Sequence, residues 1–361
     1  MQENINTNNN LIIDKNKALK NAIMKFGIFV FIYSLMRLCA NFTLDLLINA
    51  GFFDLFNGNW KYAVELIISS VFFYFIPLIP FFILFPKKLY KRYNKTYIGS
   101  EYTKPKAFSF YPATYTLGIL TSAVTVIILL LITYLITPNV TEESITNYFG
   151  EEQTNIFVQF FIVAIFVPIM EEFFFRGVLL GTLRPFGDRF AIFASGLFFG
   201  LMHGNILQAP FASVIGFVFG YIYVRSNSLA VTTGFHMLIN GTSTLLSYFS
   251  LKSVDFIFGK AFGEVSKLDG VNYVIAFILE MILFAVMITG LIQLIKLIVK
   301  YIRSGKKKVR ISYLENEYAG FSEAKKLLYL FTNPFVLLAL GFCLYYIVSS
   351  TIDFINSCSP Q

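Results

Sequence analysis

The sequence predicts an all-α polytopic membrane protein, a bundle of eight or nine transmembrane helices with a polar site inside the membrane. Of its 361 residues, 56% are hydrophobic and only 14% are charged, which excludes an ordinary soluble domain and a disordered chain. Apolar runs of about 20 residues recur along the chain, and a helix of this length crosses a bilayer. Two adjacent glutamates, Glu171 and Glu172, stand inside one such run. A charge there costs at least about 2.5 kcal/mol, so the pair is a functional hypothesis by default.

Nine apolar segments are candidates for membrane-spanning helices. The fifth and sixth are short and nearly contiguous, so we expect them to form a hairpin that does not fully cross the membrane. The count is therefore eight or nine. The candidates are residues 23–50, 62–85, 113–137, a segment that begins near 155, 190–207, 211–224, 229–249, 273–299 and 327–349.

The polar parts of the chain predict its orientation. Residues 1–22 are polar and precede a long apolar segment without a small-residue cleavage pattern, so we expect a cytoplasmic tail and a retained first helix. Lysine and arginine are concentrated in the stretches 86–106 and 300–326. Both stretches lie on the cytoplasmic side if the N-terminus is cytoplasmic. The opposite side would then carry Glu142, Glu143, Glu151 and Glu152.

Charge and cysteine content bear on two classes of partner. The net charge of +8 gathers in stretches between apolar segments, which indicates cytoplasmic loops that could also contact anionic lipid headgroups. We therefore expect the lipid bilayer as a partner and no nucleic acid. Cys39, Cys343 and Cys358 are far apart and form no CxxC or Cys/His cluster, so neither a structural metal site nor a disulfide framework is predicted.

Spacing separates the two glutamates of the fourth segment. Glu172 and Arg176 are four residues apart, so they share a helix face and can form an ion pair. Glu171 points about 100° away around the helix, so it can face a water-filled cavity instead. Because adjacent positions diverge, we do not expect the two carboxyl groups to share a proton.

Two further polar pairs contain both histidines of the chain. His203 follows Phe199 by one helical turn, and the ring of Phe199 could fix the orientation of the imidazole. Asn240 follows His236 by one turn, and the two side chains could donate hydrogen bonds to one oxyanion. Counted from the basic residues near the segment ends, Glu171 lies at a depth similar to that of these pairs.

Glycine spacing predicts close packing of the fifth and sixth segments. Small residues at every fourth position let membrane helices approach one another closely. The repeats are Gly196, Gly200 and Gly204, followed by Gly216 and Gly220. We therefore expect these segments in the core, where they can hold His203 against its neighbours.

Simpler interpretations of the polar residues stay open. The polar residues form three clusters: Glu171 and Glu172 with Arg176, Phe199 with His203, and His236 with Asn240. Each polar side chain of these clusters could simply be hydrogen-bonded or ion-paired within a helix bundle. Other charged residues also fall in or near apolar segments, and a catalytic role is not expected for them. Arg37, Asp45 and Glu65 could lie near helix ends or pair with one another, whereas Glu280 lies inside its segment.

The three clusters resemble the motifs of the type II CAAX prenyl endopeptidases and their bacterial relatives, the CPBP (Abi) family of intramembrane proteases. EExxxR, FxxxH and HxxxN are matched in order at 171–176, 199–203 and 236–240. The resemblance covers about residues 155–250. It implies a CAAX-protease-like catalytic core at 151–250. The polar and apolar pattern predicts the remaining parts: a polar cytoplasmic tail (1–22), N-terminal transmembrane helices (23–150), and C-terminal transmembrane helices with a basic cytoplasmic linker (251–361).

The resemblance implies an intramembrane, glutamate-dependent endopeptidase that acts on a membrane-associated peptide or protein. It implies that Glu171, helped by His203, activates water. It implies further that His236 and Asn240 form the oxyanion hole. The remaining motif residues would support the site, and they are Glu172 and Arg176.

Cofactor and function each keep an alternative. No cofactor is expected, but Glu171, His203 and His236 could form a zinc site of two histidines and one carboxylate, although HExxH is absent. The alternative function is a non-catalytic membrane scaffold for bacteriocin immunity or for regulation of a partner protein. A transporter is less favoured, because no internal repeat is visible. The Asn-, Lys-, Ile- and Phe-rich composition suggests a bacterial source, hence a multi-pass protein of a bacterial cell membrane.

Overall fold

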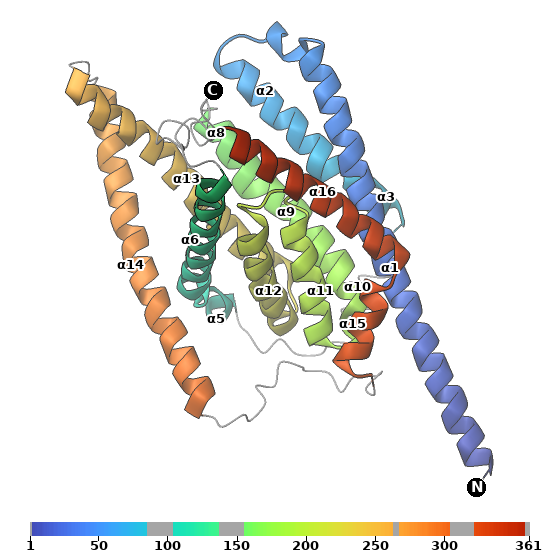
Figure 1. Cartoon of the computed structure of the whole chain (residues 1–361). Helices are drawn as coiled ribbons and strands as arrows, with labels where there is room; N and C mark the ends of the chain where they lie inside the picture. Colours follow the sequence, from blue (N-terminus) through green and yellow to red (C-terminus); the bar gives the residue numbers. More distant parts are fainter. Residues whose placement is uncertain (1, 85–103, 137–154, 263–266, 304–320, 358–361) are drawn as a thin grey trace.

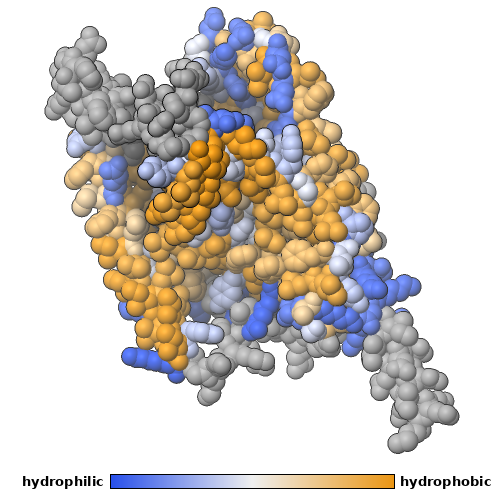
Figure 2. All heavy atoms as spheres, in the orientation of Figure 1, coloured by the Kyte–Doolittle hydropathy of each residue, from blue (hydrophilic) through white to orange (hydrophobic). Residues whose placement is uncertain are grey.

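Helices make up the fold of the residues that the structure, a computed structural model, describes: 2–84, 104–136, 155–262, 267–303 and 321–357. The long helices α1 (Gln2–Asn49) and α14 (Lys267–Arg303) lie on opposite edges of the bundle (Figure 1). Figure 2 shows a broad hydrophobic band around the middle of the molecule, with hydrophilic residues mainly toward its ends. This is the surface expected of a protein that lies in a bilayer. The predicted all-α, multi-pass membrane fold is confirmed.

Seven helices of the described residues are long and apolar enough to cross a membrane. Each overlaps a predicted segment. Two other predicted segments, 190–207 and 229–249, lie in α11 (Asp188–Leu201) and α13 (Leu229–Phe262), which pack in the same bundle. The seven are Asp14–Asn49, Trp60–Ile83, Lys106–Ile136, Ile156–Phe186, Ala209–Ser226, Gly270–Arg303 and Pro334–Asn356.

Shorter elements complete the segments on either side of the core. A 3-10 turn, η1 (Phe52–Leu55), follows α1. The second span consists of α2 (Asn59–Ser70), the π-helical η2 (Val71–Phe75), the 3-10 turn η3 (Ile76–Leu78) and α3 (Ile79–Leu84). The third is α5 (Lys104–Phe108) with α6 (Tyr111–Ile136), and the C-terminal part is α15 (Glu323–Phe331) with α16 (Pro334–Ser357).

The fourth span, which carries the two glutamates, alternates between α- and π-helical turns. Pro168 interrupts the hydrogen bonding of this span, because it has no N–H to donate to the preceding turn. At the residue before it, the N–H of Val167 bonds to the carbonyl of Ile162, five residues back. The span ends in a 3-10 turn that contains Arg184 and Pro185. Its elements are α8 (Ile156–Gln159), η4 (Phe160–Phe166), α9 (Val167–Glu172), η5 (Phe173–Leu180), α10 (Gly181–Leu183) and η6 (Arg184–Phe186).

The fifth segment is shorter than predicted. A helix extending to residue 207 is wrong, because α11 ends at Leu201 and His203 lies in the turn that follows. Gly204 adopts φ 70°, the left-handed conformation that commonly ends helices. The chain then returns as α12 (Ala209–Ser226), so the expected hairpin is present, but α12 is long and apolar enough to cross a membrane, contrary to the expectation of incomplete crossing.

Glycines let α11 and α12 touch through their backbones. A Cβ atom added to Gly216 would lie 3.0 Å from the Cα of Gly196, and one added to Gly200 would lie 2.6 Å from the backbone nitrogen of Ser213. No side chain fits between surfaces so close. The predicted close packing is confirmed for this hairpin. Gly204 does not take part in it and instead provides the left-handed conformation that ends α11.

Several sequence predictions fall outside the described residues. Most of the basic loop residues lie within 85–103 and 304–320, and the four acidic residues lie within 137–154. Cys358 also lies outside the described residues. Because the loop residues that predicted the orientation are not described, the cytoplasmic N-terminus stays a prediction. Within the described part, α16 packs beside α1, and its Cys343 belongs to the same core as Phe174 and Phe198.

The helix contact leads to a stability prediction. Gly200→Ala places a methyl group against the backbone of α12, and we expect a loss of about 1–3 kcal/mol of unfolding free energy. Gly341→Ala is the matched control, because a Cβ on this α16 residue meets nothing within 4 Å. Helix propensity alone favours alanine by about 1 kcal/mol at both positions. Thermal unfolding in detergent should therefore shift in opposite directions, and equal shifts would contradict the packing described.

Candidate active site

A buried ion pair, which also hydrogen-bonds a histidine, lies beneath the site. Oε1 of Glu172 lies 2.8 Å from Nη1 of Arg176, and both side chains are fully buried. The same oxygen lies 3.0 Å from Nδ1 of His236 on α13. The predicted Glu172–Arg176 pair is confirmed, and it also holds the histidine of a different helix.

Arg176 is further enclosed by the α11–α12 hairpin. Its Nη2 donates to the carbonyl of Gly216, at 3.2 Å. Its guanidinium carbon lies 4.4 Å from the ring centre of Phe199 and 5.1 Å from that of Phe219. Ion pairing, a backbone acceptor and two aromatic faces thus compensate a cation removed from water.

Glu171 lines a cavity of about 420 Å³. The same cavity is lined by His203, His236 and Asn240, whereas Glu172 and Arg176 do not line it. Oε2 of Glu171 lies 3.6 Å from Nε2 of His236, too far for a good hydrogen bond. The two glutamates diverge as the spacing predicted.

His203 is oriented by the last turn of α11. Its Nδ1 lies 2.8 Å from the carbonyl oxygen of Phe199, and its ring packs edge-on against that of Phe199, with centroids 5.1 Å apart. A carbonyl only accepts, so Nδ1 carries the proton and Nε2 of the neutral ring keeps its lone pair. Phe199 also lies 5.7 Å from His236, so one ring contacts both histidines.

His236 receives its orientation from Glu172. Oε1 of Glu172, which is paired with Arg176, is the acceptor in their hydrogen bond, and Nδ1 of His236 is the donor. Nε2, which is turned toward Glu171, then carries a hydrogen only when the ring is protonated. The protonation state of His236 therefore decides whether it can donate into the cavity.

Asn240 has a partner that sequence reasoning missed. Its Nδ2 donates to the carbonyl of Val163, at 3.0 Å. In a π-helical turn the carbonyl of Val163 would accept a hydrogen bond from the N–H five residues later, at position 168. Residue 168 is proline, which has no N–H. Asn240 thus satisfies a carbonyl that Pro168 cannot. The available signal was a proline three residues before Glu171.

Sequence reasoning also missed the wall built by the second span. Ser69 and Ser70 of α2 and Phe73 and Tyr74 of η2 line the cavity beside Glu171. In the sequence these residues differ from their neighbours only in that two serines and a tyrosine interrupt an apolar segment, which is a weak indication of a site.

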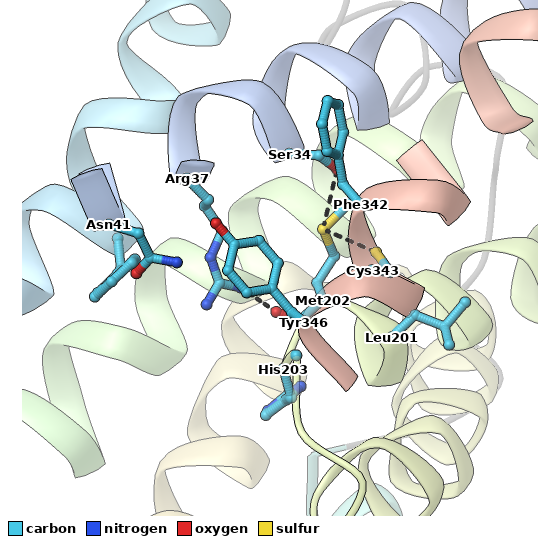
Figure 3. Close-up of a pocket in the computed structure, with 11 residues that line it drawn as sticks. Ser34, Arg37, Asn41, Leu201, Met202, His203, Phe342, Cys343 and Tyr346 are labelled. Carbon is cyan, nitrogen blue, oxygen red and sulfur yellow. Dashed lines mark hydrogen bonds between the residues drawn. The ribbon is translucent and has the colours of Figure 1, made fainter. Parts of the chain in front are cut away.

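Arg37 lies near His203 and not with the acidic residues suggested by the sequence. Among the ion pairs of the described residues, none joins Arg37 to Asp45 or Glu65. It donates instead to the carbonyl of Met202, the residue before His203 (Figure 3).

The donor set gives little support to the zinc alternative. Within the described ranges, no group of three or more His, Cys, Asp or Glu side chains is arranged to hold a metal ion. Glu171 and His236 approach each other, and the bond from Nδ1 of His203 to the carbonyl of Phe199 leaves Nε2 as the one ring nitrogen of His203 that could bind a metal. The expectation of a metal-free site stays a prediction.

Comparison with known proteins identifies relatives of the middle of the chain. Residues 153–242 match the family model of the type II CAAX prenyl endopeptidase Rce1-like proteins. This segment of the chain is thus similar to the CPBP family. The membrane-embedded CAAX protease MroQ of Staphylococcus aureus (strain USA300) is 36% identical over 88 residues, 22% of this chain and 36% of the relative.

A second relative is YdiL of Bacillus subtilis (strain 168), named as a candidate membrane peptidase. It is 30% identical over 74 residues, 20% of this chain and 30% of that protein. The chain thus spans about a third of the length of the curated relatives that it matches. No solved structure matches the chain.

The Asn240 contact leads to a prediction by double mutation. Asn240→Ala leaves the carbonyl of Val163 without its partner, and we expect it to cost about 1–3 kcal/mol of unfolding free energy. In a Pro168→Ala background the new N–H can reach that carbonyl, so the same substitution should cost about 1 kcal/mol less. Chemical or thermal unfolding of the four proteins in detergent measures the difference. An equal cost in both backgrounds would show that Pro168 does not create the need for Asn240.

Proposed function

We propose that this protein is an intramembrane, glutamate-dependent endopeptidase that hydrolyses a peptide bond in a membrane-associated peptide or protein. One observation carries the proposal: Glu171, both histidines and Asn240 line one cavity inside the helix bundle. The match of residues 153–242 to the type II CAAX prenyl endopeptidase family model supports a membrane endopeptidase in general. A bacterial cell membrane and a cytoplasmic N-terminus are parts of the same proposal.

Glu171 is the proposed general base. Its carboxylate takes a proton from a water molecule while the free lone pair on Nε2 of His203 accepts a hydrogen bond from the same water. The resulting hydroxide attacks the carbonyl carbon of the scissile bond and forms a tetrahedral intermediate. The bond to nitrogen then breaks, and Glu171 returns its proton to the leaving amine.

His236 and Asn240 are the proposed donors to the oxyanion. Protonated His236 donates from Nε2, and Glu172 on its other nitrogen stabilises the positive ring. Asn240 gives one N–H to Val163 and has a second to offer. The Glu172–Arg176 pair, outside the cavity, acts through His236.

The proposed site conserves its charge through the chemical step. The carboxylate of Glu171 loses its negative charge when it takes the proton, and the oxyanion acquires one. Positive charge on His236 lies beside both positions, since its Nε2 is 3.6 Å from Glu171. A low-dielectric site therefore gains no net charge during the reaction.

Substitution of the proposed base tests the function. We expect Glu171→Gln to lower processing of membrane peptides by about 10²–10⁴-fold, the usual contribution of a general base, and His203→Ala to abolish most of it. Glu280→Gln, on exposed α14, is the matched control and should leave processing unchanged. The readout is the profile of membrane-peptide fragments from cells carrying each variant at equal folded amount. Identical profiles for wild type and Glu171→Gln would favour the scaffold alternative.

Metal dependence is tested separately. We expect purified, active protein to contain far less than one zinc per chain and to keep its activity after treatment with a strong chelator. Elemental analysis and activity before and after chelation measure this. Stoichiometric zinc, with activity lost on chelation and restored by zinc alone, would establish the metal site instead.

A further inference from the structure

A second, smaller cavity lies on another side of His203. It has a volume of about 170 Å³ and shares His203 and Phe73 with the larger cavity. Arg37 and Asn41 reach it from α1, and Tyr346 reaches it from α16 (Figure 3). These helices lie outside the segment matched by the family model, 153–242, so the family comparison assigns no role to this cavity.

Arg37 is the charged group of this cavity. Its guanidinium donates to the carbonyl of Met202 and lies 5.4 Å from the ring centre of Phe73. Within the described residues it forms no ion pair with an acidic side chain. Glu171 is close enough to interact with it electrostatically, but Glu171 faces the larger cavity. A cation in a membrane-spanning helix is costly and marks a functional site by default.

We propose that Arg37 binds a carboxylate of the substrate peptide, on a part of the peptide that extends past His203 into the smaller cavity. A guanidinium pairs with carboxylates through a planar fork of donors, and the amide of Asn41 offers another donor beside it. The proposal rests on the proposed function, since it identifies the chemistry of the substrate at the same site.

The size of the cavity limits how the carboxylate arrives. A volume of about 170 Å³ suits a carboxylate with a few water molecules better than a long segment. The charged group therefore lies at the end of a short extension from the bond cleaved beside His203. It is either the C-terminal carboxylate of the peptide or an acidic side chain close to that bond.

Binding to an inactive full-length chain tests this without hydrolysis. The protein is Glu171→Gln in detergent, and the probes are acetyl-Leu-Val-Phe with a free carboxylate, the same peptide as a carboxamide, and acetyl-Leu-Val-Asp-amide. We expect at least one acid to bind about tenfold more tightly than the carboxamide. The acid that binds more tightly identifies the source, terminal or side-chain. No preference for either acid overturns the proposal.

Substitution of Arg37 then assigns the preference to this residue. R37Q should bind all three probes with the affinity of the carboxamide, whereas K296Q, which removes an exposed cation on α14 at the far edge of the bundle, should keep the preference. A preference kept by R37Q overturns the proposal. So does an equal loss of affinity for acid and amide, which would mean that Arg37 acts only through Met202 or Glu171.

A conservative variant covers the case in which R37Q does not fold. R37K keeps the charge but not the planar fork, so we expect it to retain a reduced preference. An unchanged or absent preference in folded R37K overturns the proposal. Because binding is measured in a chain that cannot cleave, a failure of the proposed protease function alone would leave these affinities unaffected.

Discussion

The cost of burying charge inside a membrane protein shapes this site, and the Glu172–Arg176 pair meets that cost. Both side chains are fully buried, and loss of one partner from such a pair typically costs about 3–5 kcal/mol. Each member also reaches beyond the pair: Glu172 holds His236, and Arg176 bonds to the backbone of Gly216. The pair therefore joins α9 and η5 to α13 and α12, and the position of His236 depends on it.

Phe199 provides the second common element. Its ring contacts Arg176 and both histidines, and its carbonyl fixes the tautomer of His203. This position requires α11 and α12 to touch through glycine, since a Cβ on Gly216 would lie 3.0 Å from the ring of Phe199 as well as from Gly196. The glycine repeats and the polar motifs thus form one packing arrangement.

The sequence allowed much of this to be predicted, because periodicity reports which helix face a residue occupies. The pairing of Glu172 with Arg176 and the divergence of Glu171 followed from spacing alone. The end of α11 did not, because the apolar run continues past Leu201 and only the left-handed Gly204 stops the helix. The position of Arg37 was also missed, since a contact between helices so distant in sequence depends on packing that no local pattern encodes.

Asn240 shows why a motif residue can serve structure and chemistry together. One of its N–H groups is fixed on Val163 because Pro168 leaves that carbonyl without a backbone donor, and this bond fixes the direction of the other N–H. The turn that positions Asn240 is continuous with the turn that carries Glu171, since Pro168 and Glu171 belong to the same short helix α9. The proposed base and the proposed oxyanion donor are therefore held at a fixed separation through one irregular helix. A regular α-helix with an N–H at residue 168 would remove that link, so the backbone irregularity is part of the geometry of the proposed site.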